Sequence, residues 1–275
     1  MENNIPTWTK KQYILSGYRE QNNNSSNYFI SILKIHNESI NIWTHLLSLL
    51  YFLHIIIKNN SYDNVILLYD FIAALCFFIS IVYHVYMPYS ENNYLLLLQL
   101  DLYSIILNIT ISNILVNYYW FWCYDNIRHY FMILSTIYLG VGSVILLKFN
   151  VIKIYDYILV YYGLYNIFIP LSYIYIYIIT NGNINIIIIY DFSESLIYFI
   201  IGFAIYLTKI PEILFINKFD IIGNSHQLWH IFSSIGIYYF HEEIIKNREY
   251  RLFDNCYQCL NNVSEIHSLT SKFVI

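Results

Sequence analysis

Long hydrophobic runs separated by short polar segments dominate the amino-acid sequence. A helix of about 20 apolar residues crosses the roughly 30 Å hydrocarbon core of a bilayer. Seven runs are of this order of length, and they cover residues 42–57, 65–87, 94–116, 131–147, 157–179, 186–207 and 227–245. The pattern therefore predicts an all-α integral membrane protein, a bundle of seven transmembrane helices.

The polar segments divide the chain into three parts. We expect a polar, cytosolic N-terminal segment over residues 1–40, a seven-transmembrane domain over residues 41–246 and a short C-terminal tail over residues 247–275. The first part has no early apolar core of the kind that signal peptides carry, so the first span is expected to direct insertion. Pro170 lies inside the fifth run, where it predicts a kink.

Composition supports the membrane assignment. The chain is 58% hydrophobic and 12% charged, with a mean hydropathy of +0.48. Soluble proteins carry about 25% charged residues. The net charge of −4 provides no basic field for nucleic acid, so we expect no nucleic-acid partner.

Lys and Arg are distributed unevenly between the two sides of the predicted bundle. If the N-terminus is cytosolic, the inner segments hold Lys10, Lys11, Arg19, Lys34, Lys148, Lys153, Lys209 and Lys218. The outer segments then hold Lys58, Arg128, Lys246, Arg248, Arg251 and Lys272. Because cytosolic segments favour positive charge, this excess predicts a cytosolic N-terminus and an extracytosolic C-terminus.

Four cysteines offer little evidence of chemistry. Cys256 and Cys259 form a single Cys-x-x-Cys in the tail, and Cys76 and Cys123 lie elsewhere. A structural zinc site would need two more such ligands nearby. A local disulfide or two free thiols is the favoured interpretation of the tail pair.

Four polar residues in separate spans are expected to lie at one depth. His226 and His230, at positions i and i+4, share a helix face at the start of the seventh span. His84 ends the second span, and Asp101 lies two turns into the third. Because helix direction alternates across the membrane, all four fall near the same side of the bilayer.

These residue types suit a catalytic metal centre. Three imidazoles leave one open position on tetrahedral Zn²⁺, and zinc lowers the pKa of a bound water to about 7. Asp101 could accept and return a proton of that water. Ser80, one turn before His84, could donate to an oxyanion or support a ligand.

Packing is the alternative explanation for such residues. A single intramembrane histidine is more often a hydrogen-bonded packing residue than a ligand. We interpret His45, His54 and His241 in this way. Asp101 by itself could pair with Asn108 or with a hydroxyl group.

Several short motifs resemble the progestin and adipoQ receptor family, which includes adiponectin receptors and bacterial hemolysin III proteins. The motifs are HNESINIWTHLL at 36–47, SIVYH at 80–84, LDLYS at 100–104, IPE at 210–212, KFD at 218–220 and SHQLWH at 225–230. The resemblance implies seven helices with a cytosolic N-terminus. It also implies zinc held by His84, His226 and His230, with Asp101 near its water.

Two functions compete on this basis. The first is zinc-dependent hydrolysis of a ceramide-like lipid amide, with a membrane lipid or lipid-like molecule as ligand. The second is a non-enzymatic signalling receptor in which zinc is structural. A transporter or pore ranks below both, because the polar residues cluster near one side and do not line a continuous path.

Overall fold

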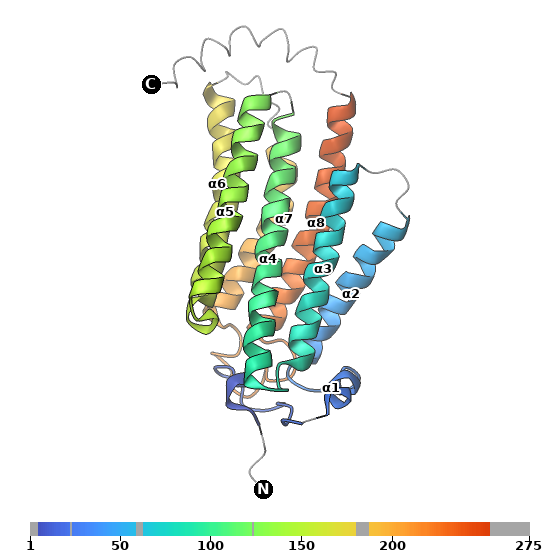
Figure 1. Cartoon of the computed structure of the whole chain (residues 1–275), viewed down its shortest axis with the longest axis vertical. Coiled ribbons are helices and arrows are strands. Elements are labelled where there is room, and N and C mark those ends of the chain that lie inside the picture. Colours follow the sequence, from blue (N-terminus) through green and yellow to red (C-terminus); the bar gives the residue numbers. More distant parts are fainter. Residues whose placement is uncertain (1–4, 23, 59–62, 123, 180–186, 254–275) are drawn as a thin grey trace.

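The computed structural model describes residues 5–22, 24–58, 63–122, 124–179 and 187–253. Its elements in chain order are η1 (Thr7–Thr9), α1 (Ser25–Ser31), α2 (Ser39–Lys58), α3 (Asn64–Tyr86), α4 (Glu91–Trp120), α5 (Asp125–Lys148), α6 (Val151–Ile179), α7 (Ile187–Thr208) and α8 (Ser225–Phe253). The long helices run side by side along the longest axis (Figure 1). The predicted all-α membrane bundle is confirmed.

Each predicted span corresponds to one long helix, and most of these helices extend past the predicted run. Helix α4, for example, begins with a polar turn, residues 91–93, before the run 94–116. Its first turn is capped by Ser90, whose side chain accepts a hydrogen bond from the backbone N–H of Asn93. Hydropathy does not detect such turns, because they carry polar side chains on a helical backbone.

The number of membrane spans stays a prediction. In the described part of the chain, α2 to α6 are each long and apolar enough to cross a membrane. The described apolar part of α7, Phe192–Thr208, is shorter. Helix α8 packs closely against α7 along the bundle.

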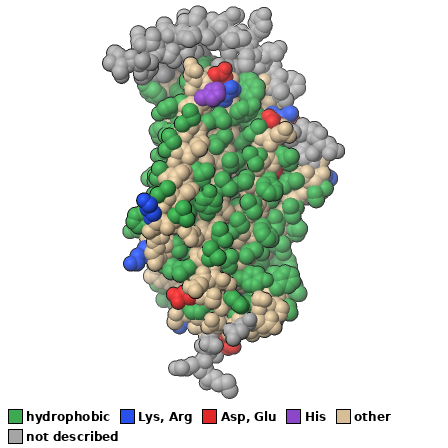
Figure 2. Space-filling view, in the orientation of Figure 1, with side chains coloured by type: hydrophobic (Ala, Val, Ile, Leu, Met, Phe, Trp, Pro, Cys, Tyr) green, Lys and Arg blue, Asp and Glu red, His purple; other side chains and the backbone are tan. Residues whose placement is uncertain are grey.

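The interior and the outer surface of the bundle are both apolar. One large cluster of buried side chains joins Phe52, Tyr69, Trp120, Tyr173 and Phe240 from five helices. On the outside, hydrophobic side chains cover most of the visible face, and charged groups lie towards the helix ends (Figure 2). A hydrophobic surface of this extent is unfavourable in water, whereas the lipid tails of a membrane solvate it.

The N-terminal segment folds back over one end of the bundle. Asp220, in the connection between α7 and α8, accepts hydrogen bonds from the Leu15 backbone N–H (3.0 Å) and the Ser16 hydroxyl (2.7 Å). The Trp8 indole donates to the Met87 carbonyl at 3.0 Å. This end also holds the last turn of α3 and the first turns of α4 and α8 (Figure 1). We call residues 5–38 the N-terminal cover.

Candidate metal centre

Three of the predicted residues meet beneath the N-terminal cover. His84 comes from the last turn of α3, and His226 and His230 come from the first two turns of α8. Each offers one ligand atom, and these atoms all lie within 4.8 Å of one another. The group could therefore hold a metal ion, as the alternation of helix direction led us to expect.

The unpaired nitrogens of these rings fit a cation. Nε2 of His84, Nε2 of His226 and Nδ1 of His230 are buried and have no hydrogen-bond partner among the described residues. A buried polar atom without a partner is unfavourable. A metal bound between the three nitrogens would satisfy all of them, and a set of three imidazoles suits zinc with an open fourth position.

The start of α8 is fixed in place by the connection that precedes it. Glu212, which is buried, accepts hydrogen bonds from the backbone N–H of Ser225 (2.7 Å) and from the Ser225 hydroxyl. The side chain of Asn224 accepts from the Gln227 N–H at 3.1 Å. These contacts cap the helix immediately beside His226, so they hold the ligand pair in position.

Glu38 is a site residue that the sequence analysis did not assign. Its carboxylate is buried, and Oε2 lies 2.8 Å from Nδ1 of His84. The other oxygen forms a 2.7 Å ion pair with Lys11 in the N-terminal cover. A carboxylate on the far nitrogen of a metal-binding imidazole fixes the ring's tautomer and direction. The available signal was an acidic residue inside the 36–47 motif, just before an apolar run.

The loop that carries Glu38 is itself ordered by His36. Nδ1 of His36 accepts the Glu38 backbone N–H at 3.1 Å, and Nε2 lies 3.1 Å from the Ser31 carbonyl oxygen. Burial lowers the pKa of His36 to about 4, so the ring is neutral at neutral pH. A neutral ring that donates from Nε2 and accepts at Nδ1 satisfies both contacts.

Arg19 connects the cover to the helix of the first ligand. Its guanidinium donates to the carbonyl oxygens of His84 (2.5 Å) and Val85 (2.9 Å) at the end of α3. Burial lowers the pKa of Arg19 to about 10, which leaves it charged at neutral pH. The positive group therefore caps the C-terminal end of α3.

Asp101 and Ser80 lie on the wall of a cavity that His226 and His230 also line. The cavity has a volume of about 250 Å³. Ser80 lies beside the Asp101 carboxyl group, whose Oδ1 is buried and has no hydrogen-bond partner among the described residues. The hydroxyl neighbour that the sequence suggested for Asp101 is thus present, and one carboxyl oxygen remains an acceptor without a partner.

The other histidines of the helices differ from one another. The side chain of His54 is exposed, and His241 is buried with Nδ1 2.7 Å from Oδ1 of Asp70, as a packing residue should be. His45 is different, because its ring stacks on His230 with centroids 3.8 Å apart and an interplanar angle of 13°. Both of its nitrogens are buried without a partner in the described chain. His45 is therefore a packing residue without the expected hydrogen bond, and it lines the same cavity.

Cys76 is the cysteine that lies within the described part of the chain. Cys76 is buried as a free thiol and lines the cavity one turn before Ser80. The predictions for Cys123, Cys256 and Cys259 fall outside the described residues.

The fold and this geometry define a class of protein: a helical membrane protein with a buried trio of histidines at one end of its bundle. The haemolysin-III related family matches residues 33–241, which include all the residues of the centre except Lys11 and Arg19. The chain therefore belongs to this family, which confirms the resemblance drawn from its motifs.

Similar proteins of known sequence extend over most of the chain. Heptahelical transmembrane protein 1 of Arabidopsis thaliana is 26% identical over 84% of this chain and 76% of its own length. Progestin and adipoQ receptor family member 3 of Homo sapiens is 25% identical over 89% of this chain and 84% of its own length. An uncharacterized protein of Schizosaccharomyces pombe is 29% identical over 84% of this chain, which spans 55% of that longer protein.

Proposed function

We propose that this protein is a zinc-dependent hydrolase of lipid amides of the ceramide type. The observation that carries the proposal is the position of Asp101: a buried carboxyl group with one unpartnered oxygen, on the wall of the cavity that His226 and His230 also line. A purely structural zinc site is usually closed by four protein ligands. Three histidines and a neighbouring acid leave room for a reacting group.

The residues divide the chemistry between them. His84, His226 and His230 would hold zinc, which supplies a Lewis acid and an activated water. Asp101 accepts a proton from the water as the water oxygen attacks the amide carbon. Asp101 then returns the proton to the nitrogen as the C–N bond breaks, which yields a fatty acid and an amine. Ser80, which lies beside Asp101, would orient its carboxyl group.

The cavity wall supports a lipid substrate. Leu164 of α6 and Ile200 of α7 line the cavity, and both side chains are exposed. A lipid could therefore pass between α6 and α7 from the membrane without crossing water. The rest of the lining is mostly apolar, which suits an acyl chain.

The test is turnover of a ceramide by the purified, zinc-loaded protein beside Asp101→Ala. We expect the variant to keep its zinc and to lose roughly 10²- to 10⁴-fold in rate, as is typical for removal of a general acid–base. Asp125→Ala, which removes an exposed carboxylate at the start of α5, is the matched control. Failure of metal-loaded wild-type protein to hydrolyse any lipid amide would refute the proposal.

A signalling receptor with a structural metal is the second candidate. The names of the human relative and of an ADIPOR-like receptor of Saccharomyces cerevisiae, a further similar protein, favour it. In that case the metal would link α3 to α8, and His45 of α2 would pack against His230 beside it. Chelation would lower the melting temperature, and Asp101→Ala would leave signalling intact.

The proposal includes seven spans and a cytosolic N-terminus. The Arabidopsis relative is named heptahelical, which supports the count. The excess of Lys and Arg on the side of the N-terminal cover supports the orientation. The metal centre would then lie near the cytosolic surface of the membrane.

A further inference from the structure

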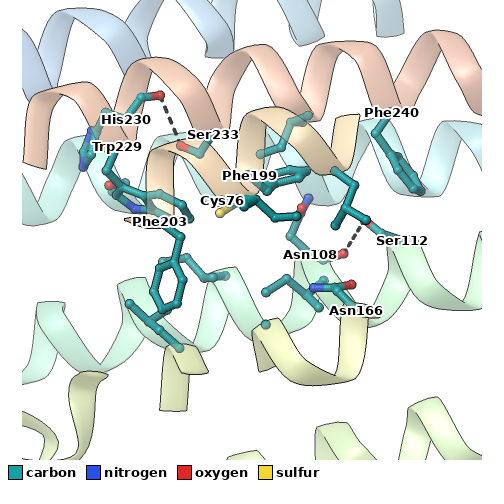
Figure 3. Close-up of a pocket in the computed structure, with 18 of the residues that line it drawn as sticks. Cys76, Asn108, Ser112, Asn166, Phe199, Phe203, Trp229, His230, Ser233 and Phe240 are labelled. Atoms are coloured by element: carbon teal, nitrogen blue, oxygen red, sulfur yellow. Dashed lines mark hydrogen bonds between the residues drawn. The ribbon is translucent and has the colours of Figure 1, made fainter. Parts of the chain in front are cut away.

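The cavity has a second polar region, far from the histidines. Asn108 and Ser112 of α4 lie on one wall, and Asn166 of α6 lies close by (Figure 3). Asn113 lines the same region. His230 and Trp229 lie at the other side of the cavity in this view. A simple acyl-chain pocket would have apolar residues at these positions.

Two of these amide groups lack partners. Nδ2 of Asn108 and Nδ2 of Asn113 are buried and donate no hydrogen bond to any described residue. The whole side chains are 5% and 2% exposed. A buried amide that donates to nothing is unfavourable, more so inside a bilayer where water is scarce. Both donors therefore favour a ligand or waters in the cavity that can accept hydrogen bonds.

Helix geometry gives the separation between the two polar regions. Asn108 follows Asp101 by seven residues on α4, which is two turns, so the two side chains share a face. The rise along the helix is about 10 Å to Asn108 and about 18 Å to Asn113. A molecule that reaches both regions is thus extended, with polar groups roughly that far apart.

The chemistry of the lining limits what the second polar group can be. The described residues that line the cavity include neither Lys nor Arg. A carboxylate or phosphate placed there would be a buried charge without a counterion. A neutral acceptor, such as a hydroxyl or carbonyl group, matches amide donors at no such cost.

We propose that the cavity selects lipid amides whose acyl chain carries a hydroxyl or carbonyl group near its middle. This inference rests on the proposed function for the position of the amide, and it names the substrate class more closely. Asn108 and Asn113 are the specificity residues. The two amides lie about 8 Å apart along α4, so one or the other donates to the mid-chain oxygen while the amide carbonyl lies at the metal centre.

Two matched probes test the proposal: an N-stearoyl amide and the same amide with one hydroxyl group at mid-chain. Their dissociation constants are measured on full-length, zinc-loaded Asp101→Asn protein, so that binding is observed without turnover. We expect the hydroxylated probe to bind at least tenfold more tightly. In the same background, Asn108→Leu with Asn113→Leu should remove this preference, so that the two probes bind with equal affinity. Asn92→Leu, at the exposed first turn of α4, is the control and should keep the preference.

Equal affinity of the unsubstituted asparagine protein for the two probes overturns the proposal, whether or not the leucine variants fold. A preference that survives both leucine substitutions also overturns it, because the amides would then donate only to water. The outcome is independent of hydrolysis. Absence of turnover in wild-type protein refutes the hydrolase, whereas absence of a hydroxyl preference refutes only this specificity.

Discussion

Glu38 shows how a single side chain can link the surface of the molecule to the candidate metal centre. One carboxylate oxygen pairs with Lys11, which is partly exposed, and the other contacts Nδ1 of the fully buried His84. The Asn41 side-chain amide donates a 2.6 Å hydrogen bond to the Glu38 oxygen that also contacts His84. The carboxylate thus has partners on three sides, which fixes the direction of the His84 ring.

The first prediction concerns this contact. Glu38→Gln keeps the shape and an acceptor for His84 but removes the negative charge and the ion pair with Lys11. We expect zinc affinity to fall about 10- to 100-fold, the usual effect of losing such a supporting carboxylate. Competition with a zinc-binding dye measures it, and Glu91→Gln, an exposed acid at the start of α4, is the control. Unchanged affinity would show that the carboxylate only holds the N-terminal cover.

The second prediction concerns the ligands themselves. His226→Ala removes one of three nitrogens, so bound zinc in the purified protein should fall from about one per chain to near zero. Elemental analysis reports this without any assay of activity. His54→Ala, which removes an exposed imidazole from α2, should retain the metal. Equal zinc content in the two variants would exclude His226 as a ligand.

At the residue scale, helix connectivity predicts a shared depth and no more. His84, His226 and His230 lie at one depth because α3 ends where α8 begins, which the hydropathy pattern indicates. That their rings meet follows only from the packing of α3 against α8 in the structure. The position of Glu38 depends on the loop fold around His36, and the stacking of His45 depends on how α2 meets α8. Neither follows from spacing in the sequence.

At the scale of elements, the N-terminal cover differs most from its prediction. The sequence indicated a polar lead-in, because residues 1–40 carry no hydrophobic period. The segment is ordered by partners far along the chain: Asp220 for Leu15 and Ser16, and Gln227, whose amide donates to the Asn37 carbonyl at 3.2 Å. Local patterns do not contain contacts of this range, whereas they do predict the long helices.

The third prediction tests what holds the cover. Asp220→Ala leaves the Leu15 N–H and the Ser16 hydroxyl without their acceptor, which should destabilise the fold by about 1–3 kcal/mol. A thermal melt of the purified protein in detergent measures the change. Asp125→Ala, at an exposed carboxylate, should shift the melting temperature far less. A similar shift in both variants would mean that the Asp220 contacts contribute little.

The fourth prediction concerns pH. His36 has a pKa of about 4 in the folded protein and about 6.5 when unfolded. The unfolded chain therefore binds this proton first, so stability from His36 is full above about pH 6.5 and falls as the pH is lowered towards 4. Melting temperatures of zinc-loaded protein should decline over this range, and His36→Gln should decline less. Parallel pH curves for the two proteins would contradict the assignment.

At the scale of the whole molecule, composition and hydrophobic pattern predicted the class, and the arrangement of helices came only from the structure. A chain of 58% hydrophobic residues in seven long runs has few alternatives to a helical membrane bundle. The sequence did not indicate that α2 packs against both α3 and α8, or that α4 contacts α6. Those contacts depend on side-chain shape on faces that are uniformly apolar.

Orientation is the whole-molecule property that would decide where the products of the proposed hydrolysis appear. The metal centre lies at the end of the bundle that carries the N-terminal cover (Figure 1). With that end in the cytosol, the amine and fatty acid would be released near the cytosolic leaflet.

We expect an epitope tag before Met1 to bind antibody once the plasma membrane alone is permeabilised. A tag after Ile275 should bind antibody on intact cells, without permeabilisation. If the protein lies in an internal membrane, this tag should bind only after all membranes are opened. The reversed pattern would place the candidate centre at the opposite leaflet. If both tags lie on the same side, the number of spans is even and seven is excluded, because each crossing moves the chain to the other side.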